Sequence, residues 1–244
     1  MSPDRVVCIV PTYNERENLR DIATAVRSHG YWLLVVDDNS PDGTGEIAQE
    51  LARDDPGCSV LHRKAKEGLG PAYAAGFDRA LSSDAGVIIE MDADFSHDPS
   101  DLPRLVEAVE KGADLAIGSR YVPGGSTPDW PLLRQLISRG GNLYARIMLG
   151  IPIRDATAGF RAFAADALRN LPYTEAEASG YGFQVEMAWR AHSAGLEIVE
   201  VPIAFRDRTR GTSKMGPPIV FEAMRLVTLW GFGRLREALR SRSR

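Results

Sequence analysis

Short apolar runs alternate with amphipathic stretches through the first half of this chain. Runs such as VVCIV and WLLVV predict five buried strands, at 6–10, 32–36, 59–62, 87–91 and 115–119. Between these strands, apolar residues recur at helical spacing and predict helices at 18–29, 45–53, 70–81 and 101–111. Because strands alternate with helices, we expect βαβ units that build a mostly parallel sheet with helices on both faces.

The second half of the chain has a less regular pattern. It predicts a helix at 132–149 that Gly140 and Gly141 interrupt, a helix at 183–194 and a strand at 197–201. An amphipathic helix is expected at 219–239, weakened by two glycines near its middle. No repeat, low-complexity tract or linker divides the chain, so we predict a single α/β domain over residues 1–244.

Charge is distributed unevenly along the chain. The net charge is −4, yet residues 204–244 contain ten arginine or lysine residues against three acids. A basic tail on an acidic body predicts an anionic partner for the tail. Cys8 and Cys58 have no CxxC neighbour, which excludes a disulfide framework, argues against a zinc site and favours reduced cytosolic thiols. We expect no signal peptide and no membrane-spanning helix.

Polar segments follow four of the predicted strands. They are PTYNE at 11–15, DDNSPDGT at 37–44, DADFSHDP at 92–99 and Arg120. Ligands of open parallel sheets bind beyond the carboxyl ends of the strands, so these segments predict one binding rim. DDNSPDGT is also rich in turn formers, but beside the other segments we favour a role for Asp38 in accepting hydrogen bonds from a ribose or a base.

The acids of the fourth segment raise a question of charge. Asp92, Asp94 and Asp98 repel one another unless they point into water or share a cation. In an extended chain Asp92 and Asp94 would point the same way, and their hard oxygens suit Mg²⁺ or Mn²⁺. No strand ends in a phosphate-loop motif, so bound phosphates would need that metal. We expect His97 at a helix entry or on the surface.

Seven motifs together carry a resemblance to a known family. PTYNE, VVDDNSPDGT, DADFSH, GSRY, TAGFRAF, GYGFQVEM and FRDRTRGTSKMG occur in the order and approximate spacing of the dolichol-phosphate mannose synthases. These are inverting glycosyltransferases of the GT-A fold, family two, and the resemblance covers roughly residues 5–230. It implies a Rossmann-like GT-A domain with a nucleotide-binding half at about 1–120, an acceptor-side half at about 121–216 and an amphipathic helix at about 217–244.

The resemblance also implies an activity. Mannose would pass from GDP-mannose to a polyprenyl phosphate at the cytoplasmic face of a membrane, giving β-mannosyl phosphopolyprenol. The same chemistry with UDP-glucose is the nearest alternative. A nucleotidyltransferase and a non-catalytic nucleotide-sugar-binding subunit are further alternatives. The basic loop and the lipid-like helices argue against the first of these, and the intact DAD, Arg120 and Lys214 argue against the second.

Site residues carry over from the family by position. The guanosine would be held by Pro11, Tyr13, Glu15, Val36 and Asp38, and the nucleotide sugar would touch Asp92 and Ala93. The resemblance places the metal on Asp94, with Asp92 as a further ligand. Ser96, which stands where some relatives have Gln, would be a weaker ligand that reaches the metal through water. The diphosphate and the acceptor phosphate would contact Arg120, Arg208 and Lys214, with Arg139 as a further acceptor contact.

An acceptor phosphate monoester is largely ionised at neutral pH, because its second pKa is about 6, so it needs positioned cations rather than a general base. RDRTRGTSK crowds Arg206, Arg208, Arg210 and Lys214 together. We favour a loop that closes over anions rather than a solvated basic loop. For Asp155, Arg161, Gln184 and Glu186 two readings stay open: they line the acceptor side, or they form buried pairs that support the sheet edge.

Two segments predict contact with a membrane surface, 131–153 and 219–244, because both combine large apolar residues with arginines. Either segment could instead pack on the sheet. We expect the first to pack partly on the core and the second to touch lipid. Attachment would be peripheral or supplied by a small membrane-protein subunit, and no nucleic-acid partner is expected.

Overall fold

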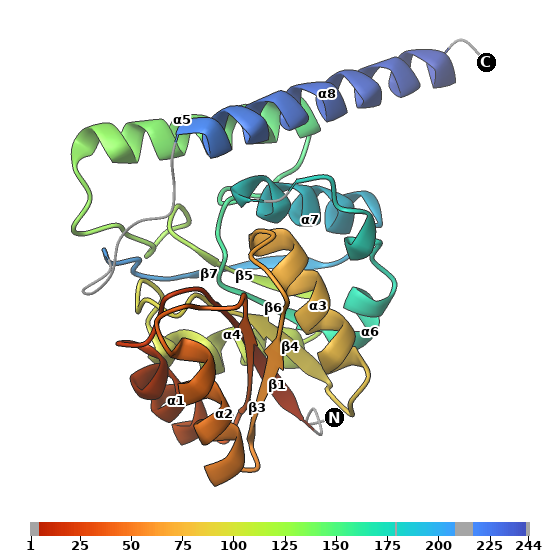
Figure 1. The fold of residues 1–244 in the computed structure, drawn as a ribbon. Coiled ribbons are helices and arrows are strands. Elements are labelled where there is room, and N and C mark those ends of the chain that lie inside the picture. The colour runs from red at the N-terminus through yellow and green to blue at the C-terminus, as the bar shows by residue number, and fades with distance from the viewer. Residues whose placement is uncertain (1–4, 179, 208–216, 243–244) are drawn as a thin grey trace.

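A seven-stranded sheet forms the centre of the computed structural model, which describes residues 5–178, 180–207 and 217–242 (Figure 1). The strands are β1 (Val6–Thr12), β2 (Trp32–Asp37), β3 (Cys58–His62), β4 (Val87–Glu90), β5 (Leu115–Ser119), β6 (Arg161–Ala164) and β7 (Ile198–Pro202). Their order across the sheet is β3-β2-β1-β4-β6-β5-β7. All neighbours pair in parallel except β6, which runs antiparallel to both β4 and β5. The predicted GT-A type of sheet is confirmed.

The described part of the chain forms eight α-helices. They are α1 (Leu19–Ser28), α2 (Thr44–Asp54), α3 (Leu69–Leu81), α4 (Leu102–Glu110), α5 (Leu132–Leu149), α6 (Ala165–Arg169), α7 (Tyr181–Ser193) and α8 (Pro217–Arg242). Short 3₁₀ helices span Pro99–Asp101 and Tyr173–Glu175. Helices α1, α2 and α4 cover one face, whereas α3 and α7 cover the other (Figure 1).

Burial on both faces explains the continuous apolar runs of the strands. Within β1, Val7 and Ile9 join the core under α3, while Cys8 and Val10 join the core under α1 and α4. A parallel strand covered on both faces needs apolar side chains at every position, and this is the pattern from which β1, β2 and β4 could be predicted.

Strand β6 was not predicted from the sequence. It has four residues, RAFA, and Ala162 pairs with Ile89 on one side and Ala116 on the other. So short a run has neither the length nor the flanking turn residues that mark a strand. Its antiparallel insertion brings the preceding segment, residues 155–160, to the rim beside β4.

The interruption expected at Gly140 and Gly141 is wrong, and the glycines expected to weaken the C-terminal helix do not end it. Helix α5 continues through Gly140 and Gly141, and α8 continues through Gly231 and Gly233. A glycine inside a helix costs only about 1 kcal/mol, which packing can offset. At Gly231 the small residue allows a close approach, because a Cβ there would lie 2.8 Å from Cε of Met148 on α5.

Helices α5 and α8 form a layer of their own on the side of α7 away from the sheet (Figure 1). The ring of Trp230 stacks on Trp189 of α7 at 5.5 Å, so this side chain packs inward on the domain. Large apolar side chains are nevertheless exposed on both helices: Leu132, Leu133, Leu136, Ile137, Leu143 and Ile147 on α5, and Phe221, Met224, Leu229 and Phe232 on α8. In the described part of the chain, no helix has the length and apolarity that crossing a membrane requires.

Candidate active site

The loop after β2 is a turn that its own side chains stabilise. Buried Asp37 accepts hydrogen bonds from the backbone N–H of Ser40, at 3.1 Å, and from the hydroxyl of Thr12, at 3.1 Å. Asp42 accepts the backbone N–H of Thr44 at 3.0 Å, which fixes the start of α2. The same loop brings Thr44 within 3.0 Å of the backbone N–H of Glu15, so the predicted nucleotide segments after β1 and β2 meet.

Asp38 is engaged by an arginine that sequence reasoning missed. Arg63, just after β3, donates from Nη1 to Oδ1 of Asp38 at 2.6 Å, and both side chains are largely buried. Burial raises the pKa of Asp38, and the neighbouring guanidinium opposes that shift. From the same loop, Nζ of Lys66 lies 4.1 Å from the ring centre of Tyr13. The end of β3 therefore adds two cations to the predicted nucleoside side of the rim.

The acidic loop after β4 bends sharply. Phe95 has a φ of 59°, and Oδ1 of Asp94 turns back to accept the backbone N–H of Ser96 at 3.0 Å. From the sequence, an extended chain was expected to point Asp92 and Asp94 the same way. The structure instead has a bend here. The Asp92 side chain is 31% exposed, whereas Asp94 and Ser96 are buried.

A divalent ion fits the oxygen chemistry of this loop. Among residues 5–178, 180–207 and 217–242, no three His, Cys, Asp or Glu side chains gather into a metal cluster. Mg²⁺ commonly takes only one or two carboxylates and completes its shell with water and substrate phosphates. Asp92 and Asp94 offer two carboxylates of that kind at the end of a sheet strand.

Of the two positions predicted for His97, the structure supports the helix entry, because His97 directly precedes Asp98, the N-cap of the 3₁₀ helix Pro99–Asp101. The surface alternative is wrong, because the residue is buried. Its ring is 2% exposed, stacks on Phe160 at 4.9 Å and meets Phe205 edge-on at 5.3 Å. Burial lowers its pKa to about 4, and the ring is therefore neutral at pH 7. The backbone N–H of Asp92 donates to Nδ1 of His97 at 3.4 Å, so the buried ring helps to hold the acidic loop in place.

Arg120 is clamped by a buried carboxylate. Its Nε and Nη2 donate to Oδ2 and Oδ1 of Asp155 at 2.7 and 2.6 Å, and Asp155 is fully buried. Nη2 also donates to the Thr157 hydroxyl at 2.8 Å. The guanidinium carbon lies 5.3 Å from the ring centres of both Trp130 and Phe205. For Asp155, the structure supports the buried-pair alternative.

A small cavity brings these groups together. Asp92, His97 and Arg120 line it, and Trp130 and Arg134 close its other side. Sequence reasoning named Arg139, which is not among the lining residues and lies 5.4 Å from the Tyr121 ring instead. Arg134, which does line the cavity, is stacked 3.9 Å above the Trp130 ring and paired with Asp207 at 2.6 Å, and the predicted role of Arg139 stays a prediction. Sequence reasoning could have found Arg134 because it lies in the first turn of the predicted helix, close after Trp130.

Arg161 and Glu186 are structural supports. Arg161 is fully buried and donates to the carbonyls of Ala158 and Ala156, each at 2.8 Å. Its Nε lies 4.0 Å from buried Glu90, whose pKa burial raises to about 7. Glu186 pairs with Arg190 at 2.7 Å. These contacts agree with the alternative in which the two residues hold the sheet edge.

The basic loop of the sequence prediction is only partly described. Arg206 is exposed, and its backbone N–H donates to the carbonyl of Ser96 at 3.2 Å. Arg208, Arg210 and Lys214 lie outside the described residues. Their predicted contacts with diphosphate and acceptor phosphate stay predictions.

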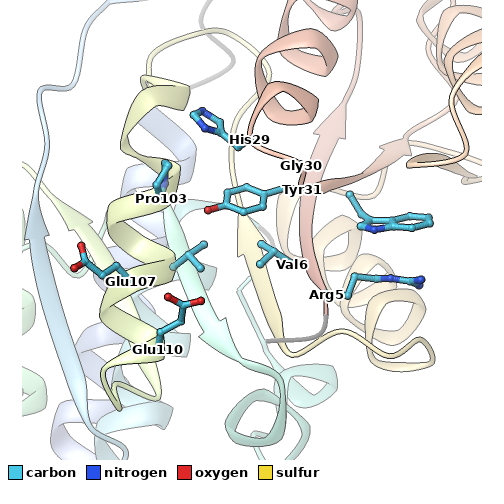
Figure 2. Close-up of a pocket in the computed structure, with 10 residues that line it drawn as sticks. Arg5, Val6, His29, Gly30, Tyr31, Pro103, Glu107 and Glu110 are labelled. Carbon is cyan, nitrogen blue, oxygen red and sulfur yellow. The ribbon is translucent and has the colours of Figure 1, made fainter. Parts of the chain in front are cut away.

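A roomier hollow lies at the opposite end of the sheet, where β1 and β2 begin (Figure 2). Glu107 and Glu110 of α4 line one side and Tyr31 the other. Its one arginine, Arg5, pairs with Asp84 at 2.6 Å. This hollow lies where the strands begin, whereas ligands of open parallel sheets bind beyond the carboxyl ends of the strands.

The sheet, its rim of carboxylates and the arginines opposite them define a glycosyltransferase of the GT-A fold. The sequence profile of glycosyl transferase family 2 matches residues 7–171, and the chain belongs to this family. The solved glucosyl-3-phosphoglycerate synthase from Mycobacterium tuberculosis, in complex with Mn²⁺, UDP-glucose and phosphoglyceric acid, has a TM-score of 0.66 at 18% identity. That match covers 94% of this chain and 79% of the other, and it shows the fold alone.

Two curated relatives are much more similar in sequence. The undecaprenyl-phosphate mannosyltransferase of Micrococcus luteus is 52% identical, covering 98% of each chain. The polyprenol monophosphomannose synthase of Mycolicibacterium smegmatis is 50% identical, covering 96% of this chain and 90% of the other. The resemblance that the motifs carry is therefore confirmed.

Proposed function

We propose that this protein transfers mannose from GDP-mannose to a polyprenyl phosphate with inversion, giving β-mannosyl phosphopolyprenol. The observation that carries the proposal is the cavity that Asp92, Arg120 and Arg134 share. A carboxylate and two guanidinium groups line this one cavity, and we assign the carboxylate to a metal and the guanidinium groups to phosphate. The names of the two relatives that are 50% and 52% identical support mannose and a polyprenyl phosphate as the substrates.

The donor nucleotide would lie along the loops after β1, β2 and β3. Pro11, Tyr13, Glu15 and Val36 are the contacts that the family resemblance assigns to guanosine, with Asp38 on the ribose or the base. Arg63 holds the Asp38 carboxylate in one orientation, because a guanidinium donates in a fixed geometry. The nucleoside subsite is thus partly organised before the donor arrives, which reduces the ordering cost of binding.

A divalent ion, Mg²⁺ or Mn²⁺, would be held by Asp94 and Asp92, with Ala93 against the nucleotide sugar and Ser96 behind a water. When bound it would neutralise charge on the diphosphate leaving group. The chain's own residues orient this arrangement. His97 accepts the N–H of Asp92, and Ser96 donates its N–H to Asp94, so both ends of the loop are fixed.

The acceptor would enter from the cationic side. Arg120 is held by Asp155, so its guanidinium keeps one direction instead of sampling many rotamers. Arg134 faces the same cavity from α5. Together with Arg208 and Lys214, assigned by the resemblance, these cations would position the acceptor phosphate. Its anionic oxygen would attack the anomeric carbon on the face opposite the departing GDP, which gives inversion without a general base.

The layer of α5 and α8 would meet the lipid. Every large exposed apolar side chain of the described residues except Val199 lies on these two helices. A polyprenyl phosphate keeps its chain in a bilayer, so an apolar surface next to the acceptor side brings the site to its substrate. We therefore place the protein peripherally at the cytoplasmic membrane face.

The test measures transfer of labelled mannose from GDP-mannose to a short polyprenyl phosphate. Reactions contain Mg²⁺, Mn²⁺ or EDTA, and UDP-glucose is run beside GDP-mannose. We expect a solvent-extractable mannosyl lipid that forms only with a divalent ion, and an anomeric configuration that is inverted by NMR. If a glucosyl lipid formed in preference, UDP-glucose would replace GDP-mannose as the assigned donor. Full activity in EDTA would contradict the proposed metal dependence.

A further inference from the structure

Arg120 and Arg134 are each paired with a carboxylate, but the two pairs differ in their exposure to solvent. Arg120 binds Asp155 through Nε and Nη2, and Asp155 is fully buried. Arg134 donates from Nη1 to Oδ1 of Asp207 at 2.6 Å, and the two side chains are 39% and 43% exposed. The first pair is enclosed by protein, whereas the second is reached by water.

This difference decides how easily each pair opens. Separating Arg120 from Asp155 would leave a buried charge without compensation, so these two residues stay together. A partly exposed pair contributes little stability, because water and dissolved ions compete with it. Arg134 can therefore leave Asp207 for another anion at small cost.

The fold, and not sequence proximity, brings Asp207 to Arg134. The two residues are 73 positions apart. The residue before Asp207, Arg206, donates its backbone N–H to the carbonyl of Ser96 in the acidic loop at 3.2 Å. On the other side of the pair, the guanidinium carbon of Arg134 lies 3.9 Å from the ring centre of Trp130. Both partners are thus held at the rim, and their meeting there follows from the architecture of the site.

A phosphate group is a stronger partner for this guanidinium than one carboxylate oxygen. A phosphate monoester carries a charge of about −1.5 to −2 at pH 7 and offers three acceptor oxygens. A guanidinium can bind two of these oxygens at once, in parallel hydrogen bonds. Stacking on Trp130 uses the face of the Arg134 guanidinium and leaves its N–H edge for an anion.

We propose that Asp207 is an internal competitor of the acceptor phosphate for Arg134. In the free site the carboxylate holds the arginine, and the arriving phosphate displaces it. This inference rests on the proposed function, because it takes the phosphate of the polyprenyl acceptor as the competing anion.

The charge balance of the transfer indicates how the exchange reverses. A phosphate oxygen forms the bond to the anomeric carbon, while the bond from that carbon to the diphosphate breaks and its electron pair leaves with GDP. The lipid product is a phosphodiester with a single negative charge, so it binds a guanidinium less strongly than the monoester does. Asp207 then recovers Arg134. The carboxylate therefore weakens binding of the acceptor and also keeps Arg134 from retaining the product.

Asp207→Asn tests this competition, because it keeps the size of the side chain and removes its charge. Calorimetry with GDP-bound protein and a detergent-solubilised short polyprenyl phosphate measures acceptor affinity without transfer. We expect the variant to bind this acceptor about three- to fivefold more tightly, the range of one exposed ion pair. The mannosyl lipid should also inhibit the variant at a lower concentration. Affinity for GDP should stay within about twofold.

Three further variants serve as controls. Asp207→Glu keeps the carboxylate and should restore wild-type acceptor affinity. Asp166→Asn removes the charge from another exposed pair, with Arg169 on α6, and should leave every constant unchanged. In an Arg134→Gln background, Asp207→Asn should no longer tighten acceptor binding, because the contested guanidinium is absent. Thermal unfolding checks that each variant is folded.

The outcomes separate this inference from the function beneath it. Weaker acceptor binding in Asp207→Asn overturns the competition, because the carboxylate would then orient Arg134 for its ligand. Unchanged acceptor binding overturns it as well. Tighter binding of GDP alone would make the donor diphosphate the competing anion and exclude the acceptor. In all three cases a wild type that transfers mannose leaves the proposed function standing, whereas a wild type that forms no mannosyl lipid overturns that function first.

Discussion

On the predicted donor side of the rim, four aspartates shape turns by accepting backbone N–H groups two or three residues away. On the acceptor side, carboxylates instead hold groups from distant parts of the chain. Four donor-side aspartates each accept the backbone N–H of a nearby serine or threonine, at 2.9–3.1 Å: Asp37, Asp42, Asp94 and Asp98. On the acceptor side, Asp155 pairs with Arg120, 35 residues earlier. Glu200 accepts the backbone N–H of Asp155 at 2.9 Å across 45 residues.

This contrast separates two uses of the same side chain. A carboxylate that shapes a turn with one oxygen keeps acceptor capacity on its other oxygen for a ligand. A buried carboxylate paired with arginine is occupied by its partner and serves to orient that partner. The turn aspartates therefore suit the ligand role that the proposed function gives them, whereas Asp155 orients Arg120.

The largest expected effect is a loss of stability when the buried ion pair on the acceptor side is removed. Asp155→Ala leaves the buried guanidinium of Arg120 without its counter-charge, and removing one partner of a buried pair costs about 3–5 kcal/mol. Urea unfolding measures the loss. As control, Asp166→Ala removes an exposed pair with Arg169 and should cost less than about 1 kcal/mol. Equal losses for the two variants would contradict the clamp.

The same substitution on the donor side should change activity instead of stability. Asp94→Ala removes the predicted metal ligand, and we expect turnover to fall about 10²–10³-fold, as when a transition-state charge loses its stabiliser. Asp98→Ala is matched, because Asp98 makes the same type of turn bond, to Ser100 at 2.9 Å, and is exposed. The control should keep its turnover. Unchanged turnover in Asp94→Ala with Mg²⁺ present would remove the metal assignment.

The two sides also differ in how far the sequence predicts them. Strands β1, β2 and β4 and the loops after them are local features, in which apolar runs and turn residues stand next to one another. The donor-side elements were therefore predictable to within about two residues. Their contacts with Arg63 and Lys66 were not, because these cations follow a third strand with no motif of its own.

On the acceptor side, the missing information is long-range. Nothing near Arg120 in the sequence indicates Asp155, and nothing near Arg134 indicates Asp207. The four residues of β6 are too few for a periodic signal, yet they decide where residues 155–160 lie. His97 has polar neighbours in sequence, although in the fold it lies between Phe160 and Phe205. Which surface of α5 faces the rim, and so the choice of Arg134 over Arg139, likewise depends on packing.

A smaller effect is expected at the apolar layer beyond the acceptor side. Leu133 and Leu136 are 69% and 68% exposed, so changing both to Gln removes little packing and should alter stability by less than about 0.5 kcal/mol. Binding to anionic vesicles should weaken about tenfold or more, because two apolar side chains no longer enter the interface. Co-sedimentation measures this, with Val199→Gln as a control on the far edge strand. If the wild type did not sediment with vesicles, this surface would not bind lipid, and a separate protein subunit would have to supply membrane attachment.

The smallest expected effect tests whether the donor-side turns are stabilised by their own carboxylates. Asp42→Ala removes the carboxylate that fixes the first residue of α2 and should cost about 1 kcal/mol at pH 7. Burial alone would raise the pKa of Asp42, but hydrogen bonds from the Thr44 hydroxyl, the Thr44 N–H and the Arg16 N–H outweigh it and lower the pKa below its ordinary value. A lowered folded-state pKa means that the contribution is complete above the unfolded pKa, near 4, and is lost as the pH falls through the folded value.

The stability difference between wild type and Asp42→Ala, measured by urea unfolding from pH 7 down to pH 2.5, should therefore shrink below about pH 4. Asp54→Ala, at the far end of the same helix, is the control, because Asp54 is exposed and pairs with its sequence neighbour Arg53. A difference that stayed constant down to pH 2.5 would show that the Asp42 side chain acts through packing, and the donor-side turns would then depend on shape more than on their carboxylates.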